Sequence, residues 1–167
     1  MTTVEPDVAS CDHRPMLVDS PDLAFDIALP VAIFVHGKRS PDPAVWTLAC
    51  GQASKAPGLD RGLIFSDGGS PDSTQRKEIV AAYGEERFRS LRSAVLSSSM
   101  GARFVVGALS LFASGIKVFA PSDARSALAY LDLPTAARAE VVRVLQEMAA
   151  TVGPRFPALA DAAKVLR

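Results

Sequence analysis

The sequence predicts a single α/β domain whose mixed, mostly parallel sheet is covered by helices on both faces. Three observations predict this class. Short apolar runs bounded by turn residues alternate with segments of helix length. The apolar runs are too short for helices. The chain has 167 residues, 49% of them hydrophobic, so it is about one domain long and can bury a core.

The N-terminal part of the chain predicts an arm and two strands. Residues 1–19 are polar and interrupted by prolines, which is typical of a flexible arm. Extended apolar runs follow at Leu23–Leu29 and Val31–Gly37. Pro30 lies between them and has no N–H for a strand ladder, so it marks the joint between two strands or an edge of the sheet.

A helix is predicted next, because Asp42 can cap it and Pro43 suits its first turn. Its apolar residues share one face: Val45, Trp46, Ala49, Cys50 and Ala53. Pro57 and Gly58 end it. The strand "GLIFSD" then leads to a polar helix, for which Ser70 is the expected cap, Pro71 the first residue and Gly84 the end.

The second half of the α/β unit repeats this alternation. The run "SAVLS" predicts a strand, "MGARFVVGALSLF" a helix that is apolar on most sides, and "IKVFA" a further strand. A helix capped by Ser122 follows over "SDARSALAYL". We expect four segments in a buried sheet: Val31–Val35, Leu63–Phe65, Ala94–Leu96 and Val118–Phe119.

The pattern changes after Pro134. Residues 20–133 form the predicted α/β domain, and residues 134–167 form a helical extension appended to it. The apolar stripe of the extension consists of Val141, Leu145, Met148 and Val152. This stripe can pack on the α/β unit or on a second copy of the chain.

Composition and charge limit the partners and the location. The 18 Lys and Arg residues balance the 18 Asp and Glu residues, so no general field would hold nucleic acid. The densest basic stretch, at Arg87, Arg89 and Arg92, is typical of a solvated face. Two cysteines do not make a disulfide framework, and we find no signal peptide or membrane span. We therefore expect a soluble, cytoplasmic protein without a cofactor.

The order of elements and the stretch "VLSSSMGARFVVGALSLFASGIKVFAPSDARSALAYLDL" resemble the STAS superfamily, especially its SpoIIAA-like, Sec14-associated branch. The resemblance covers residues 20–133 and is most evident from Ile116 to Leu131, where the branch has a strand followed by an acidic-capped helix. It implies a bacterial regulatory or ligand-sensing module without catalysis of its own, with signalling of the anti-sigma-factor antagonist type as one form.

The resemblance also implies a phosphoacceptor serine, because phosphorylated members carry an Asp-Ser-Ser-Gly motif between the third strand and the second helix. The nearest match here is Asp72-Ser73-Thr74, which makes Ser73 the candidate. The chain departs from the family where Thr74-Gln75 replaces Ser-Gly and where a charged turn begins at Arg76. Helix capping alone is the alternative explanation of these residues.

Polar residues follow two further strand ends. Asp67, Gly68 and Gly69 end one strand, where parallel sheets bind ligands, although tight turns also need glycine. Ser97, Ser98 and Ser99 end the next strand and can cap a helix or cradle an anion.

His36 ends a third strand, so His36, Asp67 and Ser97 raise a hydrolase alternative. The sequence has no nucleophile elbow, which argues against that alternative. No clustered ligands for a metal accompany the two histidines.

The sequence thus predicts a non-enzymatic regulatory or protein-interaction module. We expect its partner-binding face on the exposed Asp67–Arg76 segment, through Asp67, Gly68, Gly69, Asp72, Ser73 and Arg76. A homodimer through the Gly101–Phe112 helix or the C-terminal helices is a further expectation. The alternative function is a domain that binds a small anion, nucleotide or lipid, or a weak hydrolase, at the strand ends.

Overall fold

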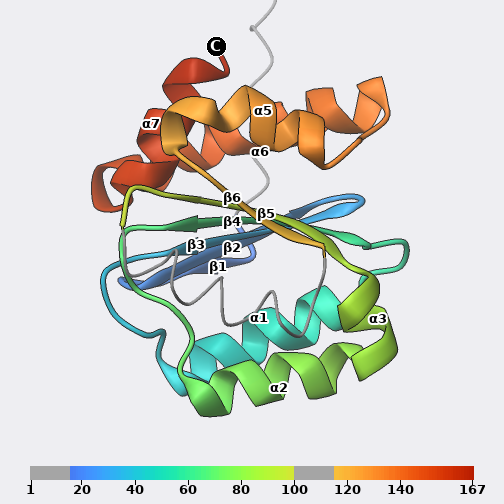
Figure 1. Cartoon of the computed structure of the whole chain (residues 1–167). Helices are drawn as coiled ribbons and strands as arrows, with labels where there is room; N and C mark the ends of the chain where they lie inside the picture. The colour runs from blue at the N-terminus through green and yellow to red at the C-terminus, as the bar shows by residue number, and fades with distance from the viewer. Residues whose placement is uncertain (1–15, 100–114) are drawn as a thin grey trace, which may run out of the picture.

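The computed structural model describes residues 16–99 and 115–167, which form a six-stranded sheet between two layers of helices (Figure 1). The strands lie side by side in chain order: β1 (Val18–Asp19), β2 (Leu23–Ala28), β3 (Val31–His36), β4 (Arg61–Ser66), β5 (Arg92–Ser97) and β6 (Ile116–Phe119). Strands β1 to β3 pair antiparallel, and β3 to β6 pair parallel. The predicted α/β class and mixed sheet are confirmed.

The helices divide between the two faces of the sheet (Figure 1). One face, which we call the α2 face, carries α1 (Pro43–Lys55), α2 (Ser73–Tyr83) and α3 (Glu85–Ser90). The other, the α6 face, carries α5 (Ala124–Tyr130), α6 (Thr135–Val152) and α7 (Pro157–Val165). The predicted helix at Gly101–Phe112 lies outside the described residues, and so does the dimer interface expected on it.

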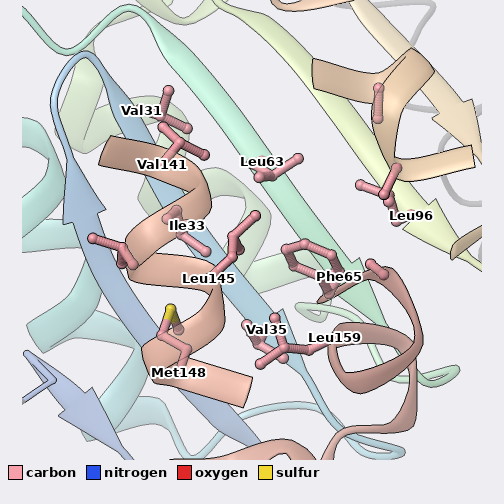
Figure 2. Packing of buried hydrophobic residues seen from close by; sticks show 14 of the residues in the cluster. Val31, Ile33, Val35, Leu63, Phe65, Leu96, Val141, Leu145, Met148 and Leu159 are labelled. Atoms are coloured by element: carbon pink, nitrogen blue, oxygen red, sulfur yellow. The ribbon is translucent and has the colours of Figure 1, made fainter. Parts of the chain in front are cut away.

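The C-terminal helices α6 and α7 pack on the sheet of the same chain, which is one of the two arrangements that the sequence left open. The predicted stripe of α6 is buried, with Val141, Leu145, Met148 and Val152 each at most 2% exposed. Figure 2 shows Val141, Leu145 and Met148 lying over the β3 residues Val31, Ile33 and Val35. These helices therefore supply much of the core that closes the α6 face.

Strand residues alternate between the two faces, as the pleat requires. Odd-numbered residues of β3 and β4, such as Ile33 and Leu63, lie in the core of the α6 face. Phe34 and Ile64, which pair with each other in the sheet register, belong to the α2 face. Burial on both faces explains why these runs are almost continuously apolar.

Several boundaries differ from the prediction. Val18 and Asp19 pair with β2, so the end of the predicted arm contains a short strand. Val118 and Phe119 are only half-buried, because β6 pairs with β5 alone among the described strands. Ser122 does not cap a helix, since a 3₁₀ turn at Pro121–Asp123 precedes α5.

The sequence did not indicate α3, and it gave Arg87 only a solvated role. Arg87 lies within α3 and donates to the carbonyl oxygens of Ser54 and Leu59 at 2.8 and 3.0 Å. These bonds tie α3 to the end of α1 and to the loop before β4. Among residues 16–99 and 115–167, no helix has the length and apolarity needed to cross a membrane.

Candidate functional site

The parallel strands β3, β4 and β5 end side by side, which brings together the polar strand ends that the sequence singled out. His36, Ser66 and Ser97 are direct neighbours in the sheet register. The side chains of all three are buried. The predicted gathering of polar groups at this edge is therefore present, although its members point in different directions.

Asp67 points toward the α6 face, where it caps a helix. Its Oδ1 atom accepts a hydrogen bond from the N–H of Ala158 in the first turn of α7, at 2.8 Å. Its Oδ2 atom is buried and has no hydrogen-bond partner among the described residues. Burial raises the pKa of Asp67 above its ordinary value, although the bond from Ala158 and the charge of Lys38 oppose the shift. The carboxylate thus holds α7 against the end of β4.

His36 points toward the α2 face, so the sheet separates it from Asp67. Its ring packs beside Phe34 and Trp46, with centroid distances of 6.4 and 5.8 Å. Burial lowers the pKa of His36 to about 4, which keeps the ring neutral near pH 7. Its Nδ1 atom is buried without a partner among the described residues. A His–Asp pair for hydrolysis is not formed by this arrangement.

Ser97 serves the scaffold. Its hydroxyl donates to the carbonyl oxygen of Ser66 at 2.8 Å and accepts from the N–H of Ser99 at 3.1 Å. These bonds join the ends of β4 and β5. Ser98 is exposed and Ser99 is half-buried. The helix that this serine run was expected to cap lies outside the described residues.

The two glycines after β4 are explained by the turn and by close packing. Gly68 has φ 115°, a conformation that residues with a side chain rarely adopt. At Gly69 a Cβ atom would lie 2.4 Å from the carbonyl oxygen of Arg39. The Ser66 hydroxyl closes the turn by donating to the carbonyl oxygen of Gly69 at 2.7 Å. Both glycines therefore have a role in the turn, without any need for a ligand.

Helix α2 begins two residues later than expected. Asp72, and not Ser70, is the N-cap: its side chain accepts from the N–H of Gln75, and the Gln75 side chain accepts from the N–H of Asp72. This reciprocal pair is a capping box. Ser73 is the first helical residue and is exposed.

The backbone around this helix start is anchored to the loop between β3 and α1. Gly69 N–H donates to the carbonyl oxygen of Gly37 at 2.8 Å, and Ser40 Oγ donates to that of Ser70 at 2.8 Å. The side chain of the buried Gln75 donates to the carbonyl oxygen of Pro41 at 2.8 Å. Two neighbouring loops are thus fixed to each other at several points.

Exposed side chains stand on this anchored backbone. We call the surface formed by residues 38–40 and 70–77 the loop edge. Ser73, Thr74 and Lys77 are exposed on it, and their side chains make no hydrogen bond with other described residues. The expected exposure of the Asp67–Arg76 segment holds for Asp72 and its neighbours but not for the buried Gly69 and Gln75.

Among the described residues, the sequence missed a hollow between the sheet and α2 that is partly open to solvent and has a cavity volume of about 140 Å³. It extends along β4 from Arg61 to Ser66. Aromatic and aliphatic side chains form most of its lining: Phe34, Trp46, Ile64, Ile79, Tyr83, Phe88 and Val95. His36, Gly69 and Arg76 lie on its wall. The even-numbered apolar residues of the strands are the signal that predicts an apolar second face.

Comparisons with protein-family models, with curated proteins and with solved structures find no match for this chain. The STAS-like assignment therefore stays a prediction that rests on the order of elements and on the pattern from Ile116 to Leu131. Within residues 16–99 and 115–167, His, Cys, Asp and Glu side chains do not gather in threes as a metal site would need. Among the described residues, the loop edge and the hollow are the features best suited to recognise another molecule.

Proposed function

We propose that this chain is a non-enzymatic regulatory module of STAS-like type that binds a partner protein through the loop edge. The main support is that the backbone of the loop edge is held in place by hydrogen bonds, whereas several side chains on it have no described partner. The backbone of the loop edge is held by the capping box and by bonds between two loops. Ser73, Thr74 and Lys77 project from it without described partners. A surface that is already ordered loses little entropy when it binds.

The roles of the other polar strand ends support a binding function over hydrolysis. Asp67 caps α7, and Ser97 joins two strands. His36 lies on the opposite side of the sheet from Asp67. The groups that a hydrolase would need are therefore already used by the scaffold or held apart.

Ser73 is the proposed phosphoacceptor within this module. Its hydroxyl is exposed in the first turn of α2, where the free N–H groups and the helix dipole favour negative charge. Phosphate adds about two negative charges at this point. Such a change would alter what the loop edge attracts without requiring the fold to change. This proposal rests on the family resemblance together with the exposed helix start.

A capture experiment with charge-matched variants tests the proposal. The immobilised full chain is compared with Lys77→Glu and with Arg138→Glu, which makes the same charge change at an exposed position of α6. Proteins bound by the wild type should be retained by Arg138→Glu and lost by Lys77→Glu. Ser73→Glu should change the same interaction. Equal retention by all four proteins would contradict a partner site on the loop edge.

A further inference from the structure

We propose that the partner bound by the loop edge presents an acidic segment, with clustered Asp or Glu side chains, to the cations of this surface. The loop edge comprises residues 38–40 and 70–77, in which four cationic residues and one acidic residue give a net charge of +3. The whole chain carries no net charge, so this positive charge is a local excess. The inference rests on the partner binding proposed above and adds the chemistry of the partner.

The fold creates this excess by joining two segments that are distant in the sequence. Two of the cations follow β3 and two lie in the first turns of α2: Lys38, Arg39, Arg76 and Lys77. The segments are held together by a bond of 2.8 Å from Ser40 Oγ to the carbonyl oxygen of Ser70. A second bond of 2.8 Å runs from the Gln75 side chain to the carbonyl oxygen of Pro41. Each segment alone has only two adjacent cations, so the patch is not visible as a basic run in the sequence.

Acidic residues beside these cations are already engaged within the chain. Asp42 and Asp72 cap α1 and α2, where the helix dipoles offset their negative charge. Asp22 forms an ion pair with Arg39 at 2.8 Å. Glu78 accepts a hydrogen bond of 2.5 Å from a hydroxyl group of α1. The remaining cations of the loop edge are therefore left to attract acidic groups of another molecule.

Lys38 and Lys77 are the most accessible of the unpaired cations. Both are exposed, and within residues 16–99 and 115–167 neither forms an ion pair. Lys77 lies on the opposite side of α2 from the buried Gln75, so its side chain points away from the sheet. Lys38 is close enough to Asp67 to affect its charge, but that carboxylate points to the α6 face and holds α7. Both ammonium groups can therefore take a carboxylate from a partner.

An acidic protein segment fits this surface better than nucleic acid does. The loop edge has only four cations, one of them paired with Asp22, and it carries no aromatic side chain on which a base could stack. The exposed hydroxyl groups of Ser73 and Thr74 can donate hydrogen bonds to carboxylate oxygens. Contacts between exposed charges are individually weak and are screened by salt, so binding should depend strongly on ionic strength.

A defined peptide tests the acidic preference. The probe is a fluorescein-labelled octapeptide of alternating Glu and Gly, and its control carries Gln in place of Glu. Fluorescence anisotropy with the full chain at low salt should show saturable binding of the Glu peptide and none of the Gln peptide. Raising the salt concentration from about 0.05 M to about 0.3 M should weaken binding about tenfold, because the Debye length falls. Ser73→Glu should weaken it about threefold, because it lowers the net charge of the loop edge.

Two pairs of substitutions with the same charge change locate the binding. Lys38→Gln combined with Lys77→Gln should weaken binding of the Glu peptide about tenfold. Lys55→Gln combined with Arg138→Gln, at exposed positions outside the loop edge, should change it by less than about twofold. Lys38→Arg combined with Lys77→Arg keeps both charges and should retain binding. Thermal unfolding of each variant shows whether it is folded.

The outcomes separate the acidic preference from partner binding itself. If Lys77→Glu abolishes partner capture but the wild type does not bind the Glu peptide, the partner site stands and its acidic chemistry is wrong. Peptide binding together with unchanged capture by Lys77→Glu would overturn the partner site and this inference with it. Equal weakening by the two substitution pairs would overturn the inference, because only overall charge would then matter. Tighter, lysine-dependent binding of a single-stranded oligonucleotide would replace the acidic protein by nucleic acid.

Discussion

The two faces of the sheet differ in how completely the described residues fill them. On the α6 face, side chains of β3, β4 and β5 meet α5, α6 and α7 in one continuous core (Figure 2). On the α2 face, a smaller core around Trp46 and Phe34 adjoins the hollow. Gly62, Ser66 and Ser93 face that hollow, so small and polar residues occupy strand positions that are large and apolar on the other side.

Within residues 16–99 and 115–167, this difference suggests a division of roles between the two faces. A filled face gives stability, because each buried apolar group adds to the free energy of unfolding. A face with space and with half-buried charge gives less stability and leaves room for recognition. Among the described residues, the features best suited to recognise another molecule are the hollow and the loop edge, and both involve residues of α2.

The largest expected effect comes from adjacent residues of β4 that point to opposite faces. Leu63 is 1% exposed in the core of the α6 face, whereas Ile64 lines the hollow. Leu63→Ala should lower the free energy of unfolding by about 3 kcal/mol, and Ile64→Ala by about 1 kcal/mol, because the second change adds little new empty volume. Urea denaturation measures both, and equal losses would remove the distinction between the faces.

The pH dependence of stability sharpens the comparison at His36. Its pKa in the folded protein is about 4, below the ordinary 6.5, so the unfolded chain binds the proton more tightly. The stabilisation is complete above pH 6.5 and is lost as the pH falls toward 4, with a total of about 3 kcal/mol. Denaturation of the wild type between pH 7 and pH 4 should show this loss. His36→Gln should show a smaller loss, and identical pH profiles would contradict the burial of a neutral ring.

Gly69, which packs against Arg39 of the loop edge, tests whether that edge is as tightly fixed as its bonds indicate, and Gly51 of α1 serves as the comparison. Gly69→Ala should cost about 2 kcal/mol, because a Cβ atom there would meet the backbone of Arg39. Gly51→Ala should stabilise the protein by about 1 kcal/mol, because this α1 position has open space around it. Thermal unfolding compares them. A Gly69→Ala protein as stable as the wild type would mean that the loop can move aside.

The smallest effect on stability is expected at Ser73. Ser73→Glu places a negative charge in the first turn of α2 and should raise the free energy of unfolding by about 0.5 kcal/mol. Asp72→Lys is not a matched control, because Asp72 forms the capping box and its loss should cost about 1 kcal/mol. A large destabilisation by Ser73→Glu would mean that the helix start is not free to carry a phosphate.

The sequence predicted the described strands other than β1, and most helix positions, because apolar periodicity and turn residues are local signals. The burial of Trp46 and Ala49 on α1 and of Leu145 on α6 follows from helical spacing alone. Contacts between distant segments could not be predicted in this way. Asp67 directly follows a parallel strand, a position where ligand-binding residues are common. In the structure it instead caps α7, which lies far along the chain in the C-terminal extension.

The candidate site was predicted in part. The register of β3, β4 and β5 explains why polar residues at the ends of successive strands gather at one edge. The pleat then places neighbouring residues on opposite faces, so His36 and Asp67 are separated. The described lining of the hollow comes from four strands and from α1, α2 and α3, and such a combination of distant segments is not encoded in any single one of them.

The most direct test of the difference between the faces is to enlarge two adjacent side chains of β5. Val95 borders the hollow, and Leu96 is 1% exposed in the filled core of the α6 face. Val95→Phe should change the free energy of unfolding by less than about 0.5 kcal/mol, because space is available, whereas Leu96→Phe should lower it by about 2 kcal/mol through overpacking. Urea denaturation of the two variants measures the difference. If Val95→Phe destabilises the protein as much as Leu96→Phe, both faces of the sheet are filled and the division of roles between them is wrong.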